Sequence, residues 1–178
     1  IMAESGARLV RQQRNGGPAV ARNAGARVAS GEILVFIDSD VVVRPDTMTH
    51  LLAAFDADPG LAGAIAVQSP TMRFRNLCSV YKNLWMYYTY VRRAGQDVPL
   101  FYTTAAGIRR QAFIDSGGFD LNYTNPNVED TDYGQKLASQ VFRVQVLPKL
   151  EVEHVKCYDL AGLLRVDFLR SMSLARLK

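Results

Sequence analysis

The sequence has little that would tie it to an oxidising compartment, a membrane or a nucleic acid. Its two cysteines, Cys78 and Cys157, lie far apart and indicate no disulfide framework, so we expect reduced thiols in a cytoplasmic protein. The most aromatic stretch, residues 84–91, is much shorter than the ~20 apolar residues that cross a bilayer, and no charged and then apolar leader opens the chain. A net charge of +4 from scattered residues is too small to indicate nucleic-acid binding and favours at most an anionic small molecule.

What is present is the composition of an ordinary soluble domain. With 178 residues, 48% of them hydrophobic, the chain is long enough to bury the core of one domain. Predicted strands and helices alternate along the first half, which indicates an α/β fold. Strands are expected at residues 8–11, 32–37 and 61–68, with helices at 19–29 and 45–55. The second half predicts helices at 76–93, 110–116, 129–140 and 160–177, extended chain at 101–108, and one or two strands over 143–155, broken at Pro148.

The strongest functional signal is Asp38-Ser39-Asp40, which follows the apolar run ILVFI. An unbroken run of β-branched and aromatic residues predicts a strand buried on both faces of a parallel sheet. Ligands of open α/β sheets lie beyond the carboxyl ends of such strands. Two carboxylates one residue apart repel each other unless a cation such as Mg²⁺ or Mn²⁺ compensates their charge and bridges them to substrate phosphates. The structural alternative is a helix cap, since Asp and Ser both cap well.

A glycine turn, Asn15-Gly16-Gly17-Pro18, precedes the first predicted helix. The free backbone N–H groups at such a helix start suit a phosphate group, and Arg22 on the helix is placed to reach an anion at the sheet edge. A plain loop and a solvent-facing arginine explain the same residues, and for Arg22 alone this second interpretation is favoured.

Acidic residues gather again in Asn127-Val128-Glu129-Asp130-Thr131-Asp132, which follows Gly117-Gly118-Phe119-Asp120. The helix dipole stabilises carboxylates at the start of a helix, so simple capping is one explanation of these acidic residues. The functional interpretation is a general base that takes a proton from a sugar hydroxyl as that hydroxyl attacks.

His154 ends the last predicted strand, after Glu153. A lone histidine is usually structural or exposed, and the functional alternatives are a metal ligand or a phosphate contact. Its spacing to Cys157 does not make a zinc site, because two residues are too few.

These four features, in this order, resemble the large family 2 of inverting glycosyltransferases, which includes cellulose synthases, hyaluronan synthases and dolichol-phosphate sugar transferases. The matching segments are NGGPAVARNAGARVASGEILVFIDSD, AAGIRRQAFIDSGGFD, NVEDTDYGQKL and LPKLEVEHV, which span most of residues 15–155. Each segment is modest alone, but the ordered set is specific. The resemblance implies a GT-A fold, a Rossmann-like α/β three-layer sandwich, in a single glycosyltransferase domain over residues 1–178.

The resemblance also implies a reaction and a set of roles. A sugar passes from a UDP- or GDP-linked donor to the hydroxyl of a saccharide or lipid-linked acceptor, with inversion, in a hexosyltransferase-like step of cell-envelope polysaccharide synthesis that uses Mg²⁺ or Mn²⁺. By matching motifs, Asp130 is the catalytic base, and Glu129 orients it or touches the acceptor. The other implied roles are donor binding by Asn15, Arg22, Asp38 and Asp40, and metal binding by Asp40, Asp38 and His154.

The chain departs from the family pattern in two places. Family members begin with a strand and a proline-tyrosine-asparagine-like turn that grips the nucleotide, and a second strand supplies an acid for the base. Both are absent, so we expect an N-terminally truncated domain: the rest of the nucleotide-binding half at residues 1–70, the acceptor-binding half at 71–155 and an amphipathic helix at 156–178. The Gln-x-x-Arg-Trp motif of processive members is also absent, since Trp85 is the only tryptophan, which favours non-processive transfer.

Two predicted helices admit more than one role. The aromatic residues of the first either flank an acceptor or pack in the core: Tyr81, Trp85, Tyr87, Tyr88 and Tyr90. The last helix is typical of either a helix packed on the domain or one lying on the inner face of a membrane. It pairs apolar Leu160, Leu163, Leu164 and Phe168 with basic Arg165 and Arg170.

Two rival functions share the α/β layout. A sugar nucleotidyltransferase needs an N-terminal glycine-rich loop for a triphosphate, and it gives the segment at Glu129 and Asp130 no role. An inactive nucleotide-sugar-binding relative would keep the fold without turnover, although the acids at Asp38, Asp40 and Asp130 are intact. Release of inorganic diphosphate from a nucleoside triphosphate plus a sugar phosphate indicates the first rival, and ligand binding without turnover indicates the second.

Overall fold

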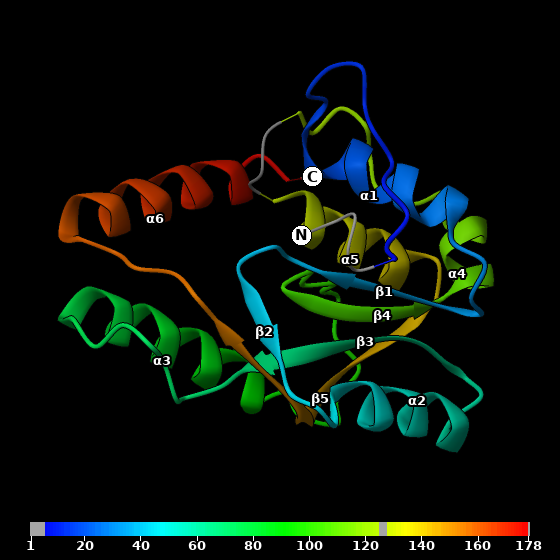
Figure 1. Cartoon of the computed structure of the whole chain (residues 1–178), viewed down its shortest axis with the longest axis horizontal. Coiled ribbons are helices and arrows are strands. Elements are labelled where there is room, and N and C mark those ends of the chain that lie inside the picture. Colours follow the sequence, from blue (N-terminus) through cyan, green and yellow to red (C-terminus); the bar gives the residue numbers. More distant parts are fainter. Residues whose placement is uncertain (1–5, 125–127, 178) are drawn as a thin grey trace.

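One mixed sheet organises the computed structural model, which describes residues 6–124 and 128–177 (Figure 1). Its strands are β1 (Ile33–Ile37), β2 (Val41–Val43), β3 (Leu61–Gln68), β4 (Ala105–Arg109) and β5 (Arg143–His154), in the order β1-β4-β3-β5-β2. β3 and β5 are parallel, whereas the β1–β4, β3–β4 and β2–β5 pairs are antiparallel. The predicted α/β class is confirmed, with a mixed sheet in place of a parallel one.

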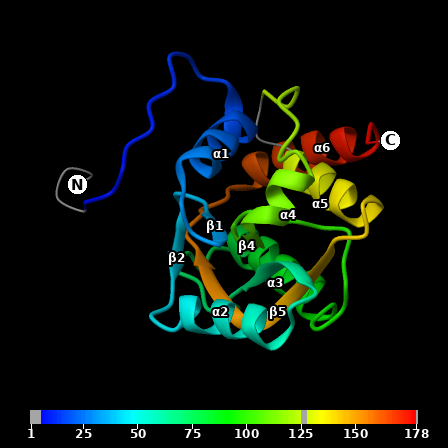
Figure 2. The ribbon, with the colours of Figure 1, turned by 90° about the vertical axis from the view of Figure 1, so that its right-hand side faces the viewer.

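Helices cover both faces of this sheet. They are α1 (Gly17–Val28), α2 (Thr47–Ala57), α3 (Leu77–Val91), α4 (Arg110–Asp115), α5 (Glu129–Ser139) and α6 (Leu160–Leu174). On one face, Leu51 and Phe55 of α2 join the smaller of two core clusters. Residues of α1, α3, α4 and α5 join the larger cluster on the other face. Figure 2 shows α1, α4 and α5 above the sheet and α2 below it, which gives three layers as predicted.

The run ILVFI forms β1, but its burial differs from the prediction. β1 is an edge strand antiparallel to β4, not a strand buried on both faces of a parallel sheet. Leu34 and Phe36 pack in or against the larger core, while Val35 and Ile37 are 37% and 44% exposed. Because every residue of the run is apolar, the sequence carries no alternation that would show which face is covered.

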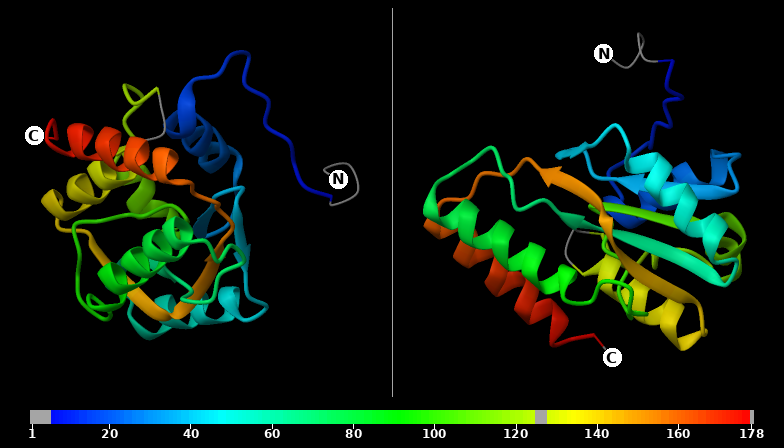
Figure 3. Two further views of the ribbon diagram at one scale, coloured as in Figure 1. Left: turned by 90° about the vertical axis from the view of Figure 1, so that its left-hand side faces the viewer. Right: turned by 90° about the horizontal axis from the view of Figure 1, so that it is seen from below.

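One other strand expectation is wrong, one open alternative is decided, and one strand was not predicted. Residues 8–11 form no strand, since this exposed segment runs outside the sheet and pairs with none of the described strands (Figure 3). β5 is one strand across Pro148: Ala66 pairs with Leu147 and Val67 with Glu151, so the residues between bulge out of the ladder. β2 was not predicted, because three residues after a turn are too short for a clear pattern.

The sheet combines both predicted halves of the domain. β1, β2 and β3 come from residues 1–70, while β4 and β5 come from 71–155 and interleave with them. Within the described part of the chain, no helix combines the length and the apolar character that a membrane span requires.

Candidate active site

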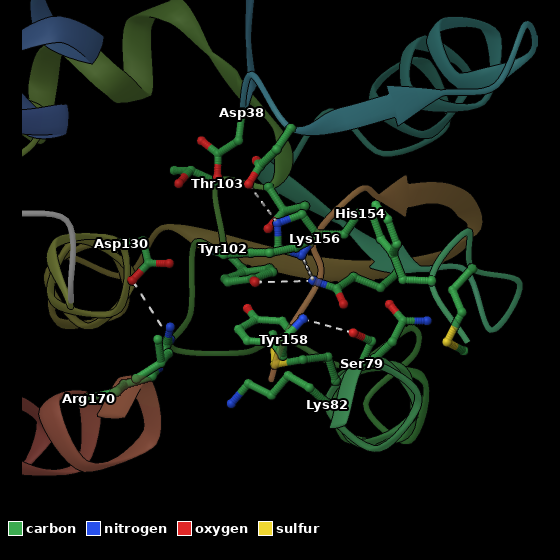
Figure 4. Close-up of a pocket in the computed structure, with 18 of the residues that line it drawn as sticks. Asp38, Ser79, Lys82, Tyr102, Thr103, Asp130, His154, Lys156, Tyr158 and Arg170 are labelled. Carbon is green, nitrogen blue, oxygen red and sulfur yellow. Dashed lines mark hydrogen bonds and ion pairs between the residues drawn. The ribbon is translucent and has the colours of Figure 1, made fainter. Parts of the chain in front are cut away.

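A pocket of about 670 Å³ lies where β1, β3 and β5 end (Figure 4). This is the edge at which the sequence placed Asp38 and Asp40, in agreement with the rule for ligand sites of open sheets. All but one of the predicted site residues line it: Arg22, Asp38, Asp40, Glu129, Asp130 and His154.

Asn15 is the exception, because it does not line the pocket. Its Oδ1 instead accepts a hydrogen bond from the backbone N–H of Gly17 at 3.0 Å, at the exposed start of α1. Gly17 has a φ of 85°, and a Cβ there would lie 2.3 Å from the carbonyl oxygen of Thr124. The glycine turn therefore serves the local geometry and close packing of the helix start, and a donor contact of Asn15 stays a prediction.

Arg22 joins two of the predicted acids. Its Nη2 donates to Oδ1 of Asp38 at 3.0 Å, and its Nη1 donates to Oε1 of Glu129 at 2.7 Å. Burial acts to lower the pKa of Arg22, but the bonds to Glu129 and Asp38 outweigh it and raise the pKa. Burial also raises the pKa of Asp38, against the lowering effect of Arg22. The solvent-facing interpretation of Arg22 is thus wrong, since its side chain fixes the start of α5 beside Asp38.

The pairing of β2 with β5 brings Asp40 to His154. Val41 is the register partner of His154, and the carbonyl of Asp40 accepts from the N–H of Val155 at 2.7 Å. Nε2 of His154 therefore lies 3.3 Å from Oδ2 of Asp40. Burial lowers the pKa of His154, and the neighbouring Asp40 carboxylate acts in the opposite direction.

Gln68 holds the other side of the same imidazole. Its Nε2 lies 3.2 Å from Nδ1 of His154 and also donates to the hydroxyl of Tyr102 at 3.2 Å. Gln68 is a buried polar residue at the carboxyl end of β3, next to β5 in the sheet. Sequence analysis missed it, although a glutamine at the end of an apolar strand is a signal that could have found it.

The donor set of Asp40 and His154 fits a divalent cation. Carboxylate oxygen and imidazole nitrogen both ligate Mn²⁺, and Mg²⁺ is held by one or two carboxylates plus substrate phosphates. Among the described residues, no three His, Cys, Asp or Glu side chains are grouped to hold an ion by themselves. Asp38 is engaged by Arg22, so its role as a ligand stays a prediction. The residues therefore fit an ion that shares its coordination with phosphate oxygens.

Asp130 lies across the pocket from this pair, at the start of α5 (Figure 4). It is only 6% exposed, and burial raises its pKa to about 6, although Arg170 acts to lower it. Its Oδ1 accepts from the backbone N–H of Thr131 at 2.7 Å and from the Thr131 hydroxyl at 3.2 Å. A carboxyl group with such a pKa is suited to accept a proton near neutral pH. Asn127, in the same motif, lies outside the described residues.

Gly134 sets the depth at which α5 packs. A Cβ on Gly134 would lie 2.4 Å from Cα of Leu100, so the helix backbone directly contacts the chain that leads into β4. Asp130 is one helical turn earlier. This close approach carries it to the pocket wall that Tyr102 and Thr103 also form.

The wall formed by α3 contains none of the five aromatic residues for which acceptor contact and core packing were both open. The pocket is lined by Ser79, Lys82, Asn83 and Met86 of α3. Tyr81, Trp85 and Tyr88 are exposed on another face of the helix, and Tyr90 is buried, stacked on Tyr102 with ring centroids 5.1 Å apart. The helical periodicity of the sequence predicts which residues share a face of α3. It does not predict which of these faces lines the pocket.

Arg170 of α6 is a further pocket residue. The sequence placed it only on the basic side of an amphipathic helix. No local signal could have found it, because α6 reaches the pocket only by folding back across it. Lys82 of α3 and Asp167 of α6 form an ion pair that holds the two helices together.

Comparison with known proteins shows the family and the fold of the chain. Residues 2–117 match the family model described as glycosyl transferase family 2. A segment is also 44% identical over 50 residues to the succinoglycan biosynthesis protein ExoO of Rhizobium meliloti (strain 1021), which is 28% of this chain and 14% of that protein.

Solved structures of similar shape include a mannosyltransferase and two further proteins solved with UDP or UDP-GlcNAc. The mannosyltransferase PcManGT from Pyrobaculum calidifontis, in complex with GDP-Man and Mn²⁺, superposes with a TM-score of 0.71 at 23% identity, over 94% of this chain and 44% of its own. GalNAc-T7 with UDP, GalNAc and Mn²⁺ gives 0.62 at 18% identity, over 86% and 32%. S. aureus TarS 1–349 with UDP-GlcNAc gives 0.58 at 16%, over 86% and 43%. The chain thus spans less than half of each of these proteins, and at such identities the likeness shows the fold.

Proposed function

The chain belongs to glycosyl transferase family 2 and has the GT-A fold, and we propose that its pocket transfers a sugar from a nucleotide-diphosphate donor to an acceptor hydroxyl with inversion at the anomeric carbon. One observation carries this proposal: a single pocket has two chemically different sides. Asp40 and His154 form a cation-binding pair on one side. Asp130, a buried carboxyl group with a raised pKa, faces the same space from the other.

The donor side of the pocket follows from Asp40 and His154. A divalent cation held by these two residues would neutralise negative charge on a leaving diphosphate. PcManGT was solved with GDP-Man and Mn²⁺, and GalNAc-T7 with UDP and Mn²⁺, which supports a nucleotide-sugar donor and favours Mn²⁺ as the cation tested first. Arg22 ties Asp38 to Glu129 and so holds the donor side and the start of α5 in a fixed relation.

The acceptor side follows from Asp130. Its carboxylate takes the proton of the acceptor hydroxyl, and the acceptor oxygen forms its bond to the anomeric carbon from the face opposite the diphosphate. The bond from that carbon to the diphosphate oxygen breaks, the diphosphate leaves with the electron pair, and the proton stays on Asp130. Glu129, bound to Arg22, orients the helix turn that carries the base.

The rival functions are less well supported. The family match favours sugar transfer over nucleotidyl transfer, and the geometry gives Asp130 a role that a nucleotidyltransferase would not need. An inactive relative would have no reason to keep Asp40, His154 and Asp130 around one pocket. The absence of a Gln-x-x-Arg-Trp motif supports transfer of a single sugar.

Release of nucleoside diphosphate tests this function. The chain is incubated with UDP- and GDP-sugars, Mn²⁺ and saccharide acceptors, and free UDP or GDP is measured. We expect release that depends on acceptor and Mn²⁺ and is lost in Asp130→Asn. Release of inorganic diphosphate from a nucleoside triphosphate and a sugar phosphate would instead identify a nucleotidyltransferase.

We also propose that the exposed apolar faces of α3 and α6 contact an anionic membrane surface, where a lipid-linked acceptor would be presented. Figure 3 shows the two helices side by side. Leu160, Leu164 and Phe168 of α6 are 63%, 62% and 65% exposed. A basic group accompanies the aromatic residues at the end of α3, since Arg92 lies over the Tyr88 ring. Aromatic and basic residues together suit the headgroup region of anionic lipids.

Vesicle flotation tests the membrane contact. We expect the chain to float with phosphatidylglycerol-containing vesicles and less with pure phosphatidylcholine. Phe168→Glu together with Leu164→Glu should abolish flotation, whereas Leu52→Glu, an exposed leucine of α2, should not. Equal flotation of all three proteins, or none by the unmodified chain, would contradict the contact.

A further inference from the structure

Arg170 faces the proposed base from a different helix. Its Nη2 lies 4.0 Å from Oδ1 of Asp130 and 3.5 Å from Oγ1 of Thr131. Its guanidinium also lies over the ring of Tyr102, 5.9 Å from the centroid. Figure 4 shows Arg170 rising from α6 toward Asp130, with both residues on the pocket wall. Three elements, α5, α6 and the segment before β4, therefore meet at this one carboxylate.

The charges around Asp130 single out Arg170 as its counter-ion. Glu129, the preceding residue, adds negative charge, and the tyrosines Tyr90 and Tyr102, of which only Tyr90 is buried, also interact with the charge of Asp130. Arg22 of α1 is the other nearby cation, but its guanidinium already binds Asp38 and Glu129. The compensation of charge on Asp130 thus falls to Arg170.

The geometry of the contact leaves the base free to react. Within the described residues, the contacts of Asp130 with Thr131 and Arg170 all fall on Oδ1. Oδ2 is left for the proton of an acceptor hydroxyl. At 4.0 Å the guanidinium acts through its charge without taking up a carboxylate oxygen in a short hydrogen bond.

We propose that Arg170 is a positioning residue for Asp130: it compensates the charge of the carboxylate and contacts Thr131, which holds Oδ1, so that Oδ2 points to the acceptor. This inference rests on the proposed function, because it assigns a role within the same reaction. It makes α6 part of the active site rather than only a surface helix. Because Arg170 lowers the pKa of Asp130, its removal must raise that pKa.

Direct titration of Asp130 tests the proposal without requiring turnover. Protein labelled with ¹³C at the aspartate carboxyl carbon is titrated by NMR, and the Asp130 signal is assigned by its loss in Asp130→Asn. In Arg170→Met we expect the midpoint to rise by about one pH unit or more. Arg170→Lys, which keeps the charge, should stay near the unmodified chain. Arg165→Met removes the same charge from an exposed position of the same helix and should leave the midpoint unchanged.

The second readout is the pH profile of nucleoside-diphosphate release from UDP- and GDP-sugars. In Arg170→Met the acid limb of the kcat/KM profile should move to higher pH together with the midpoint of the Asp130 carboxyl group. The reduction in kcat/KM relative to the unmodified chain is then largest at low pH and becomes smaller at high pH. A purely structural role would lower the rate equally at every pH. If Arg170→Met still transfers sugar and the titration midpoint of Asp130 is unchanged, the positioning role alone is overturned. Absence of transfer in every variant, including the unmodified chain, overturns the proposed function and the positioning role with it.

Discussion

Nε2 of His154 lies 3.3 Å from Oδ2 of Asp40, although one residue ends β5 and the other precedes β2. The antiparallel pairing of these two strands produces the contact, because Val41 is the register partner of His154. The donor side of the pocket is therefore set by backbone register. Loss of either side chain should leave the sheet intact, which makes the site well suited to tests by substitution.

Gln68→Leu should weaken Mn²⁺ binding about 10- to 100-fold. The substitution keeps the size of the side chain but removes the contact that orients the His154 ring. Free Mn²⁺ is measured by electron paramagnetic resonance during titration in the presence of UDP or GDP, whose phosphate oxygens share the coordination of the ion. Gln111→Leu, which removes an exposed bond to Asp115, is the matched control. Equal affinity in both variants would show that Gln68 does not orient the ligand.

The activity of the chain should fall with pH below about 6. Asp130 must be ionised to accept a proton, and burial raises its pKa to about 6. The acid limb of kcat/KM should therefore lie near that value and well above the range of an ordinary aspartate. Rates of nucleoside-diphosphate release between about pH 4.5 and 8 measure it. A limb near pH 4 would show that another carboxyl group acts as the base.

Asp130→Asn should lose turnover about 10²- to 10⁴-fold, yet make the fold more stable at neutral pH. The rise of the Asp130 pKa from 3.8 to about 6 means that ionisation disfavours the folded state, by roughly 3 kcal/mol. The stability that the neutral acid contributes is complete below about pH 4 and is lost as the pH rises through about 6.

The free energy of unfolding, measured with urea, checks this sign. The variant should exceed the unmodified chain at about pH 7.5 and match it near pH 3.5. Asp132→Asn, in the same helix turn, is the matched control variant. If Asp130→Asn were less stable at neutral pH, the carboxylate would be stabilised by its surroundings, in contrast to the raised pKa.

Gly134→Ala should destabilise the fold by about 1–3 kcal/mol, although alanine is the better helix former. Its Cβ would lie 2.4 Å from the backbone of Leu100 and would push α5 outward. Gly25→Ala, inside α1, meets nothing within 4 Å and should instead stabilise the fold. Thermal unfolding of the two variants gives opposite shifts in Tm. Shifts of the same sign would contradict the close approach of α5.

Much of the fold and the chemistry could be predicted from the sequence. The helices and the long strands have clear periodicity or turn residues, and Asp38-Ser39-Asp40 follows its strand as expected. The edge position of β1 was hidden because its residues are all apolar, and β2 was too short to detect. Gln68 and Arg170 were missed because their roles depend on which strands become neighbours and on how α6 folds back.

Calorimetric titration of UDP and GDP, with and without Mn²⁺, tests the central claim most directly. We expect one nucleotide to bind at least ~10-fold more tightly with Mn²⁺. Asp40→Ala should remove this gain, while Asp56→Ala, at an exposed acid of α2, should keep it. A Mn²⁺ effect that survives in Asp40→Ala would contradict the assignment of this pocket to a nucleotide-sugar donor.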